Sequence, residues 1–536
     1  MKSNFENTSK LVRFILRRER ISSSLCIILL SVFSIMLAPA LSNMFDVPAR
    51  EALIQTVNNP AMIGMLGPIF GIENYTAGAM YFNMMVQWVM ITAAVMNILL
   101  VVRHTRSDEE HGRVDMLRSL PTGKFSNLSA AMITAFIVNL GIALLTGVGI
   151  AVCGIESMGW NGALLYGVSI GVAGFVFAAL AAIFSQLCMT SRGAIGLSII
   201  SLGFLYLLRG AGDIGNETLS YISPLGLAQR TQAFVENNWL PILILLAEAI
   251  VIIIIAFVLN GHRDIRQGLI PERRGKENAK AYLCSPYGLA FKLLMVPFFS
   301  WIIGMFVIGA SYGSILGTID TFVQSSEFYS MMIGATSEFS TAQMFVSMVN
   351  SVMALCSVFP VLTMVMKFRS EEKDGYYQNV LSNSVSRHHY LASYVLIAFV
   401  TSVLVQCATA LGIYASAVAV LPDPGTLPLG YLLKANLVYA PALWVMIGIA
   451  VLLIGLLPKM TSVIWGYFGF SFFVTFMGRL PNFLPEWVAK LTPFGWIPNL
   501  PVDEINFATI AVLTVIAVLL MIIGFAAYRR RDVSAS

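Results

Sequence analysis

The chain has 536 residues, of which 57% are hydrophobic and only 11% are Asp, Glu, Lys or Arg, and its formal net charge is +5. A soluble globular protein is typically about 45–50% apolar and about 25% charged, so this composition excludes an ordinary soluble protein. Apolar runs of about 20 residues recur along the whole length, each long enough to cross a bilayer as a helix, and their continuity excludes a transmembrane β-barrel. The sequence therefore predicts an all-α integral membrane protein.

The polar composition gives no sign of a metal or cofactor bound to this chain. Its six cysteines are scattered singly, without the spacing of a metal site or a disulfide framework. The modest positive charge is explained by membrane topology, and we expect no nucleic-acid partner. The basic N-terminus has no clear small-residue cleavage site, so we expect it to be retained.

Twelve membrane spans are predicted, in two sets of six. The first set lies near residues 21–43, 81–102, 125–153, 163–188, 194–209 and 240–260, and the second near 293–316, 344–366, 390–417, 433–457, 463–478 and 507–528. Lys and Arg cluster before the first span, in the middle connection and after the last span. The positive-inside rule therefore predicts cytoplasmic termini, in the plasma membrane of a bacterial cell.

A dense run of charge lies between the second and third spans. In the stretch from Arg106 to Lys124, eight of nineteen residues are Asp, Glu, Lys or Arg. Ser107 and Glu110 are spaced as a capping box, and the acidic residues suit the positive end of a helix dipole. Pro121 would end such a helix. The sequence predicts a short helix here, and the alternative is a solvated loop beside the membrane surface.

The two sets of spans match each other in sequence. The segment FNMMVQWVM, from Phe82, aligns with FVSMVNSVM, from Phe345, with five of nine residues identical. The same offset places Arg106–Lys124 on Arg369–Arg387, and HRDI at His262 matches RRDV at Arg530. Because six spans per unit give both halves the same orientation, the pattern predicts a parallel tandem repeat. The expected parts are a first half at 1–265, a cytoplasmic linker at 266–285 and a second half at 286–536.

The charged segment resembles the coupling segment of ABC-2-type (type V) exporter permeases, and the whole chain resembles their twelve-span branch called exporters of polyketide antibiotics. The stretch Gln186–Asp213 and the linker after Gly261 carry the rest of this likeness. The resemblance implies that the charged segments contact an ATPase subunit, through Glu109, Glu110, Gly112, Arg113 and Leu117 in the first half and Glu371, Glu372 and Gly375 in the second. The second copy departs from the pattern at Lys373 and Tyr376.

The chain has no G-x-x-x-x-G-K-[ST] phosphate-binding loop. It is therefore expected to be a permease subunit and not an enzyme, and the resemblance implies separate ABC ATPase subunits, two per chain, that bind ATP and Mg. It also implies amphipathic elbow helices on the inner membrane surface before each half, one of them SKLVRFILRRER. Ordinary basic flanks are the alternative.

Four polar or aromatic residues in the spans are candidates for the cargo path: Gln87, Trp88, Asn350 and Glu248. Gln87 and Asn350 occupy matching positions in spans two and eight, which line the central path in the resembled family. Amides in membrane helices more commonly bond to neighbouring helices, which is the alternative. Glu248 stands alone in the sixth span and is expected to face the bundle. Arg209 and Arg479 are expected to anchor the outer ends of spans five and eleven.

The predicted function is ATP-driven export of an amphipathic or hydrophobic compound, antibiotic-like or lipid-like. The alternative is a permease complex that senses antibiotics or envelope stress. A membrane enzyme ranks below both, because the outer loops contain no histidine and no metal-like cluster. A secondary transporter is disfavoured because only Glu248 places an ionisable group near the middle of a span.

Overall fold

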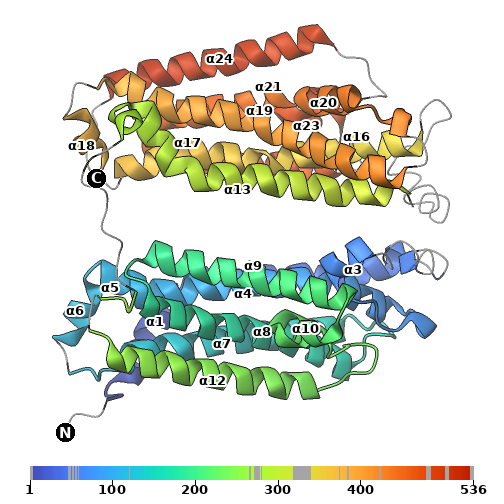
Figure 1. Ribbon diagram of the computed structural model, residues 1–536, viewed down its shortest axis with the longest axis vertical. Helices are drawn as coiled ribbons and strands as arrows, with labels where there is room; N and C mark the ends of the chain where they lie inside the picture. Colours follow the sequence, from blue (N-terminus) through green and yellow to red (C-terminus); the bar gives the residue numbers. More distant parts are fainter. Residues whose placement is uncertain are drawn as a thin grey trace. The chain divides into compact units, whose positions relative to one another are not determined.

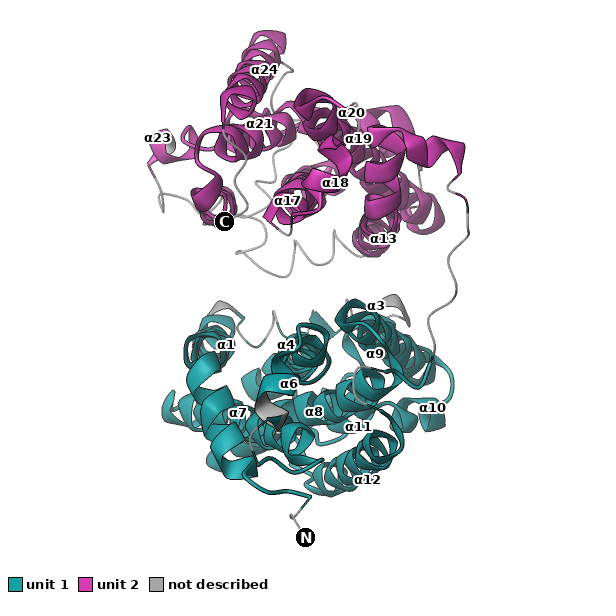
Figure 2. Cartoon of the chain, turned by 90° about the vertical axis from the view of Figure 1, so that its left-hand side faces the viewer, with its two compact units in different colours: residues 1–275 teal, residues 276–536 magenta. Residues whose placement is uncertain are grey.

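The computed structural model describes residues 4–45, 60–119, 121–264, 267–270, 280–317, 340–373, 375–382, 385–421, 424–477, 485–500 and 506–531, with residues 47, 50, 53, 54, 57 and 278. All regular secondary structure in these ranges is helical (Figure 1). The chain divides into two compact units, Met1–Gly275 and Lys276–Ser536 (Figure 2). This boundary falls within the predicted linker at 266–285.

Eleven helical stretches among the described residues are long and apolar enough to cross a membrane. The predicted eleventh span, at 463–478, corresponds to α22 (Val463–Met477), which has 15 residues. At 1.5 Å per residue that helix is about 22 Å long, less than the roughly 30 Å of a bilayer's hydrocarbon core. The chain is thus an all-helical multi-pass membrane protein with eleven of the twelve predicted spans at full length.

In unit 1, α8 is the central helix and contacts α4, α7 and α12 extensively. α1 packs along α7. The membrane helices are α1 (Thr8–Met44), α4 (Ala77–Val102), α7 (Ser126–Val152), α8 (Trp160–Leu187), α9 (Ser191–Ile214) and α12 (Leu240–His262). The short elements are α3 (Pro60–Leu66), η1 (Ile72–Asn74), η2 (Arg103–Ser107), α5 (Asp108–Glu110), α6 (Arg113–Arg118), α10 (Glu217–Ile222) and α11 (Pro224–Gln229).

Unit 2 repeats two of these helix pairings. α13 packs along α19, as α1 does along α7, and α21 packs along α24, as α8 does along α12. The main helices are α13 (Pro286–Ser314), α16 (Thr341–Cys356), α17 (Val358–Lys373), α19 (Arg387–Val420), α20 (Leu429–Leu437), α21 (Ala440–Leu456), α22 and α24 (Phe507–Arg530). The short elements are η3 (Ala281–Cys284), η4 (Ile315–Gly317), α18 (Tyr377–Leu381), η5 (Pro424–Thr426), η6 (Pro458–Met460), α23 (Glu486–Ala489) and η7 (Pro493–Trp496).

Side-chain caps fix where several of the membrane helices begin. The Thr76 side chain accepts a hydrogen bond from a backbone N–H in the first turn of α4, and Thr190 does the same for α9. Ser285, Ser386 and Asn506 cap α13, α19 and α24. Each cap satisfies an N–H that has no partner within its helix, which stabilises the helix end by about 1 kcal/mol.

The predicted elbow helices are wrong. The stretch SKLVRFILRRER is the beginning of α1, which runs unbroken into the first span. Its apolar residues Leu11 and Ile15 are buried against Ala130 of α7, so this face is covered by protein. In unit 2 the residues before Phe291 form η3 and the first turn of α13. Neither unit has a separate elbow helix among its described residues.

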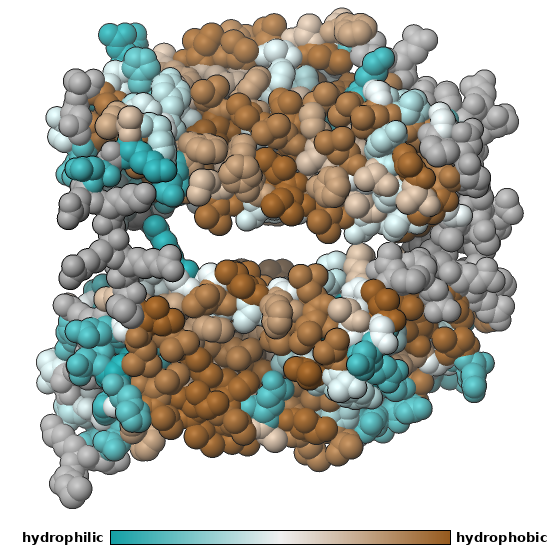
Figure 3. Space-filling view, in the orientation of Figure 1, coloured by the Kyte–Doolittle hydropathy of each residue, from teal (hydrophilic) through white to brown (hydrophobic). Residues whose placement is uncertain are grey.

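The surface of each unit agrees with a membrane environment. Apolar side chains cover most of the flanks of the long helices, and hydrophilic side chains gather toward their ends (Figure 3). Helix α12 illustrates this, because its buried face is narrow and Leu243, Ile250 and Ile254 are exposed. Such broad exposed apolar surface is the expected outer face of helices that lie in lipid.

Glycines allow the closest helix contacts in unit 1. A Cβ added to Gly167 of α8 would overlap the backbone carbonyl oxygen of Ala143 and crowd Gly147, both on α7. Gly203 on α9 has open space around the same position. Small residues at such crossings let backbones approach and gain van der Waals contact, which drives helix association in membranes.

We expect Gly167→Ala to lower the free energy of unfolding by about 1–3 kcal/mol, because the added methyl forces α7 and α8 apart. The matched control, Gly203→Ala, should be neutral or slightly stabilising, since alanine favours helix and meets no atom there. Thermal melting of the purified chain in detergent measures both. Equal melting temperatures for the two variants would contradict this account of the α7–α8 contact.

Candidate functional site

The first charged segment, residues 106–124, continues the helix that precedes it. α4 passes through the π-helical turn η2 into α5, and Ser107 has right-handed helical backbone angles with no side-chain cap. The predicted capping box is therefore wrong, because no helix begins at Ser107. Glu110 instead accepts a hydrogen bond from the backbone N–H of Ser191, at 2.8 Å, at the start of α9.

The second charged segment, residues 369–387, has the same form. α17 continues through Glu371 and Glu372 to Lys373. Each helix is followed by a glycine with positive φ, Gly112 at 71° and Gly375 at 81°. Glycine adopts this conformation without a Cβ penalty, so both glycines end a helix and let the chain turn. The single short helix predicted between Ser107 and Pro121 is therefore wrong, because Gly112 separates α5 from α6.

A buried carboxylate held by two arginines lies at the base of the first charged segment. Glu109 is 7% exposed and pairs with Arg106 at 2.9 Å and Arg263 at 2.5 Å. Arg106 also donates through Nε to the carbonyl oxygen of Met189, at 2.8 Å, in the connection between α8 and α9. This cluster joins the end of α4, the end of α12 and the α8–α9 connection.

The corresponding cluster occurs in unit 2. Glu372 is 2% exposed and pairs with Arg369 at 2.6 Å and with Arg531, which follows α24. Arg369 Nε donates to the carbonyl oxygen of Pro458, at 3.1 Å. Arg369, Glu372 and Arg531 are the positions that the sequence repeat aligns with Arg106, Glu109 and Arg263. The two ion pairs thus recur at aligned positions, and in both units the first arginine also donates to a carbonyl oxygen of a connection between helices.

These contacts correct the predicted orientation of the two acids. Glu109 and Glu372 were expected to face a partner, but each is buried in ion pairs within its own unit. A carboxylate taken out of water needs such partners, and the nearest arginines are in the same chain. Both acids therefore hold the charged segments in place.

The outer surface of the first charged segment is formed by α6 and the residues beside it. Arg113 has a half-exposed side chain and pairs with Asp108 at 2.8 Å. Met116 is 77% exposed, which makes it a large apolar side chain pointing away from the unit. The side chain of Leu117, also predicted as a contact residue, lies outside the described residues. In unit 2, Tyr376 is exposed before α18.

Helix α1 is tied to the first charged segment by ion pairs that the sequence did not reveal. Arg18 pairs with Asp108 at 2.9 Å, and Glu19 pairs with Arg103 at 3.0 Å. His104, 1% exposed, lies between Glu19 at 3.1 Å and Asp108 at 3.7 Å. Partners some 84 residues apart leave no periodic signal in the sequence.

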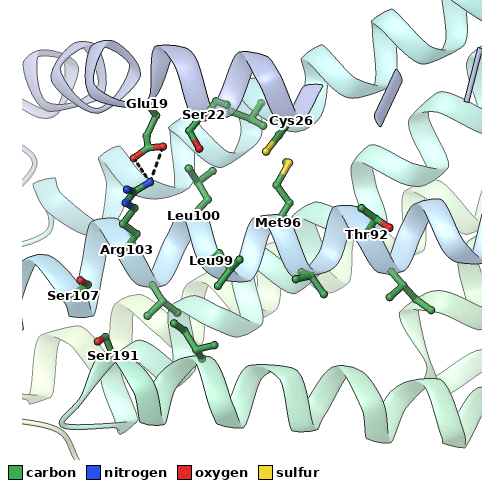
Figure 4. Close-up of a pocket in the computed structure, with 16 residues that line it drawn as sticks. Glu19, Ser22, Cys26, Thr92, Met96, Leu99, Leu100, Arg103, Ser107 and Ser191 are labelled. Carbon is green, nitrogen blue, oxygen red and sulfur yellow. Dashed lines mark hydrogen bonds and ion pairs between the residues drawn. The ribbon is translucent and has the colours of Figure 1, made fainter. Parts of the chain in front are cut away.

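An apolar groove runs along unit 1 between α1, α4 and α9. Near the first charged segment the groove has a cavity of about 730 Å³, with Glu19 and Arg103 at one end and Met96 and Leu99 in its wall (Figure 4). A second cavity of about 550 Å³ shares Cys26, Thr92 and Met96 with it. The second cavity is also lined by Leu29, Leu30, Phe33, Trp88 and Val89.

The predicted path residues fall into different environments. Trp88 is 43% exposed and lines the groove. Gln87 is buried and accepts a hydrogen bond from Gln229 at 2.9 Å, and Asn350 accepts one from Asn436 at 3.2 Å. Glu248 is partly buried beside the packed face of α12. The two amides thus bond to other helices, and Trp88 is the predicted residue that lies at the cavity.

Arg209 is not the membrane-surface anchor that we expected. Its side chain is fully buried, pairs with Asp213 at 3.1 Å and donates to the carbonyl oxygens of Gly64 and Met65. It also donates to Gln229, the partner of Gln87. The arginine therefore joins α9 to α3 and α11. Its predicted counterpart, Arg479, lies outside the described residues.

We expect Glu109→Gln to lower the free energy of unfolding by about 3–5 kcal/mol, because it leaves two buried arginines without a carboxylate. The double variant Glu109→Gln/Arg263→Gln should recover part of this loss, since fewer unpaired charges remain. Glu110→Gln is the control, because its exposed amide can still accept from Ser191. Thermal melting of the four proteins checks this. Equal stability of the two single variants would contradict the burial argument.

We expect Gln87→Leu and Asn350→Leu each to lower the free energy of unfolding by about 0.6–2 kcal/mol, the range for a hydrogen bond between membrane helices. Trp88→Leu should instead alter cargo response, because Trp88 lies in the groove wall. Melting temperature and cargo-dependent activity of the three variants separate these roles. If Gln87→Leu altered cargo selectivity at unchanged stability, Gln87 would instead be a residue of the cargo path.

Comparison with known proteins agrees with this architecture. A family model described as the multidrug efflux system permease Rv1217c, C-terminal domain, matches residues 49–259 and 283–529, one stretch in each unit. The chain is also 29% identical to the multidrug efflux system permease protein Rv1217c of Mycobacterium tuberculosis (strain ATCC 25618 / H37Rv), over 99% of this chain and 96% of that protein. The matched stretches contain both buried Glu–Arg clusters apart from Arg263 and Arg531. The chain therefore belongs to the multidrug efflux permease family that this model describes.

Proposed function

We propose that this protein is the permease subunit of an ATP-driven exporter of the ABC-2, type V class, which moves amphipathic or hydrophobic compounds out of the cell. The ATPase belongs to separate subunits, which supply the ATP and Mg sites. Membership of the efflux permease family supports the transport role. The absence of a phosphate-binding loop from the whole sequence supports a division between permease and ATPase.

The observation that carries this proposal is the paired set of Glu–Arg clusters. Glu109 and Glu372 occupy aligned positions and are held by aligned arginines, so each unit presents its charged segment in the same way. A tandem repeat of two six-helix units explains this recurrence. Two equivalent segments suit two copies of one partner, because repeated surfaces offer repeated docking sites. In this arrangement the charged segments, the linker and both termini are cytoplasmic.

The clusters also suggest how ATPase movement reaches the membrane helices. The first charged segment continues α4, and its cluster includes the end of α12 and the connection between α8 and α9. A force applied at α6 therefore acts on several spans at once, since buried ion pairs resist separation. Exposed residues such as Met116 and Arg113 supply the surface for the ATPase.

The groove between α1, α4 and α9 is the proposed cargo route on unit 1. Its volume of about 730 Å³ is within the range of small-molecule sites, which are mostly apolar with a few polar groups. Trp88, Phe33 and Met96 offer aromatic and flexible apolar surface to a hydrophobic compound. A route of this kind needs no tight polar recognition, which suits efflux of more than one compound.

Co-purification tests the proposed assembly. The full chain is purified from its host together with the ATPase that binds to it. The mass of the intact complex should correspond to two ATPase subunits per permease. ATP hydrolysis should require both proteins. The double variant Met116→Asp/Tyr376→Asp should release the ATPase without unfolding the permease, because both side chains are exposed. A ratio of one to one, or hydrolysis by the permease alone, would overturn the proposal.

A further inference from the structure

The charged end of the groove contains an ion pair whose two members differ in exposure. Glu19 on α1 and Arg103 in η2 point toward each other at one end of the cavity (Figure 4). The Glu19 side chain is 4% exposed, whereas the Arg103 side chain is 54% exposed. An ion pair with one well-solvated member contributes little net stability, because water competes for the exposed charge. Arg103 is therefore free to exchange this partner for another anion.

Glu19 keeps a second partner if Arg103 leaves. His104 Nε2 lies 3.1 Å from the Glu19 carboxylate and is buried beside it. His104 in turn lies 3.7 Å from Asp108, which also binds Arg18 and Arg113. The Glu19 carboxylate thus keeps a ring nitrogen within hydrogen-bond distance when Arg103 leaves, so the exchange does not remove its last polar neighbour.

The rest of the lining selects for one kind of ligand. Beyond Glu19, the residues around the cavity carry no further acidic group. The hydroxyls of Ser22 and Ser107 lie toward the same end as Arg103 (Figure 4). The remaining wall is mainly aliphatic and thioether surface. A ligand in this groove therefore meets a cation and hydroxyls at one end and apolar contacts along its length. Carboxylate and phosphate are the groups that an arginine fork binds best.

We propose that the groove binds single-chain amphiphiles with an anionic head, which Arg103 holds after giving up Glu19. This inference rests on the proposed function and names the cargo class for the same groove. Glu19 is then the internal competitor for Arg103, and the release of Glu19 toward His104 connects occupancy of the groove with the first charged segment. Glu19 acts through Arg103 and is a positioning residue.

Binding to the full chain tests this without any ATPase. The purified protein, in nanodiscs of phosphatidylcholine, is titrated with dansylaminoundecanoic acid and with the methyl ester of the same compound, and dansyl fluorescence reports binding. Arg103→Gln should lower the affinity for the acid by about tenfold or more, the size expected for one charge-assisted hydrogen bond, and leave the affinity for the ester unchanged. Arg103→Lys should retain part of the affinity, since it keeps the charge but not the fork.

The decisive variant is Glu19→Gln. It removes the competitor, so the acid should bind several times more tightly while the ester is unaffected. An equal loss of affinity for both probes, with a lower melting temperature, would mean that Glu19 only supports the fold, and it would overturn the proposal. Arg20→Gln is the matched control, because Arg20 is an exposed cation outside the cavity lining. If Arg20→Gln lowers the affinity for the acid as much as Arg103→Gln does, the effect is general attraction to a charged surface and the proposal fails.

The same titration in nanodiscs that contain phosphatidylglycerol separates cargo from lipid. Affinity for the acid should be little changed if the groove takes single-chain amphiphiles. Loss of binding in these discs would assign the groove to bilayer phospholipid and overturn the proposal. The measurement needs no partner, so it can fail while the stoichiometry of two ATPase subunits stands, and it can succeed if that stoichiometry proves wrong.

Discussion

A carboxylate removed from water has to keep cations beside it, and the two units meet this requirement in the same way. Glu109 is enclosed by Arg106 and Arg263, and Glu372 by Arg369 and Arg531. Separating either set would leave a buried unpaired charge, at a cost of several kcal/mol. The end of the last helix of each unit is therefore bound to the charged segment that follows its second span.

The consequences of this constraint extend through unit 1. The first charged segment is held to the end of α12 by the Glu109–Arg263 pair, and α4 continues into it through the π-helical turn η2. α1 is drawn to the same end by Arg18 and Glu19, and this brings α1, α4 and α9 around the groove. The fixed charged end thus also sets the polar end of the cavity.

The two charged segments differ in their connection to the first helix of their unit. In unit 1, α1 contributes Arg18 and Glu19 to the ion pairs of the first segment. In the described part of unit 2, the ion pairs of the second segment come from α17 and Arg531, and α13 contributes none. The link between a groove-lining first helix and a charged segment is thus a property of unit 1. In the proposed exporter, the two charged segments would therefore have unequal connections to the membrane helices.

The sequence by itself determined the helical membrane class, the positions of the spans and the alignment of the two halves. These follow from long apolar runs and from residue identities at a near-constant spacing, which are local properties. It named Gly112 and Gly375 only as expected contacts of a partner, and the helix ends at these two glycines came from the structure. Trp88, predicted from the sequence as a cargo-path residue, lines a cavity of unit 1, and its role in transport stays a prediction.

The tertiary structure decided which charges meet and where helices begin. SKLVRFILRRER is part of α1, and its apolar face packs against α7. Ser107 does not cap a helix, because η2 continues α4. Glu109 and Glu372 turned inward because arginines more than 150 positions later in the chain, Arg263 and Arg531, lie within reach only after folding. Glu19 and His104 were missed for the same reason. Local periodicity fixes the helices, but the pairing of buried charges depends on how distant helix ends come together.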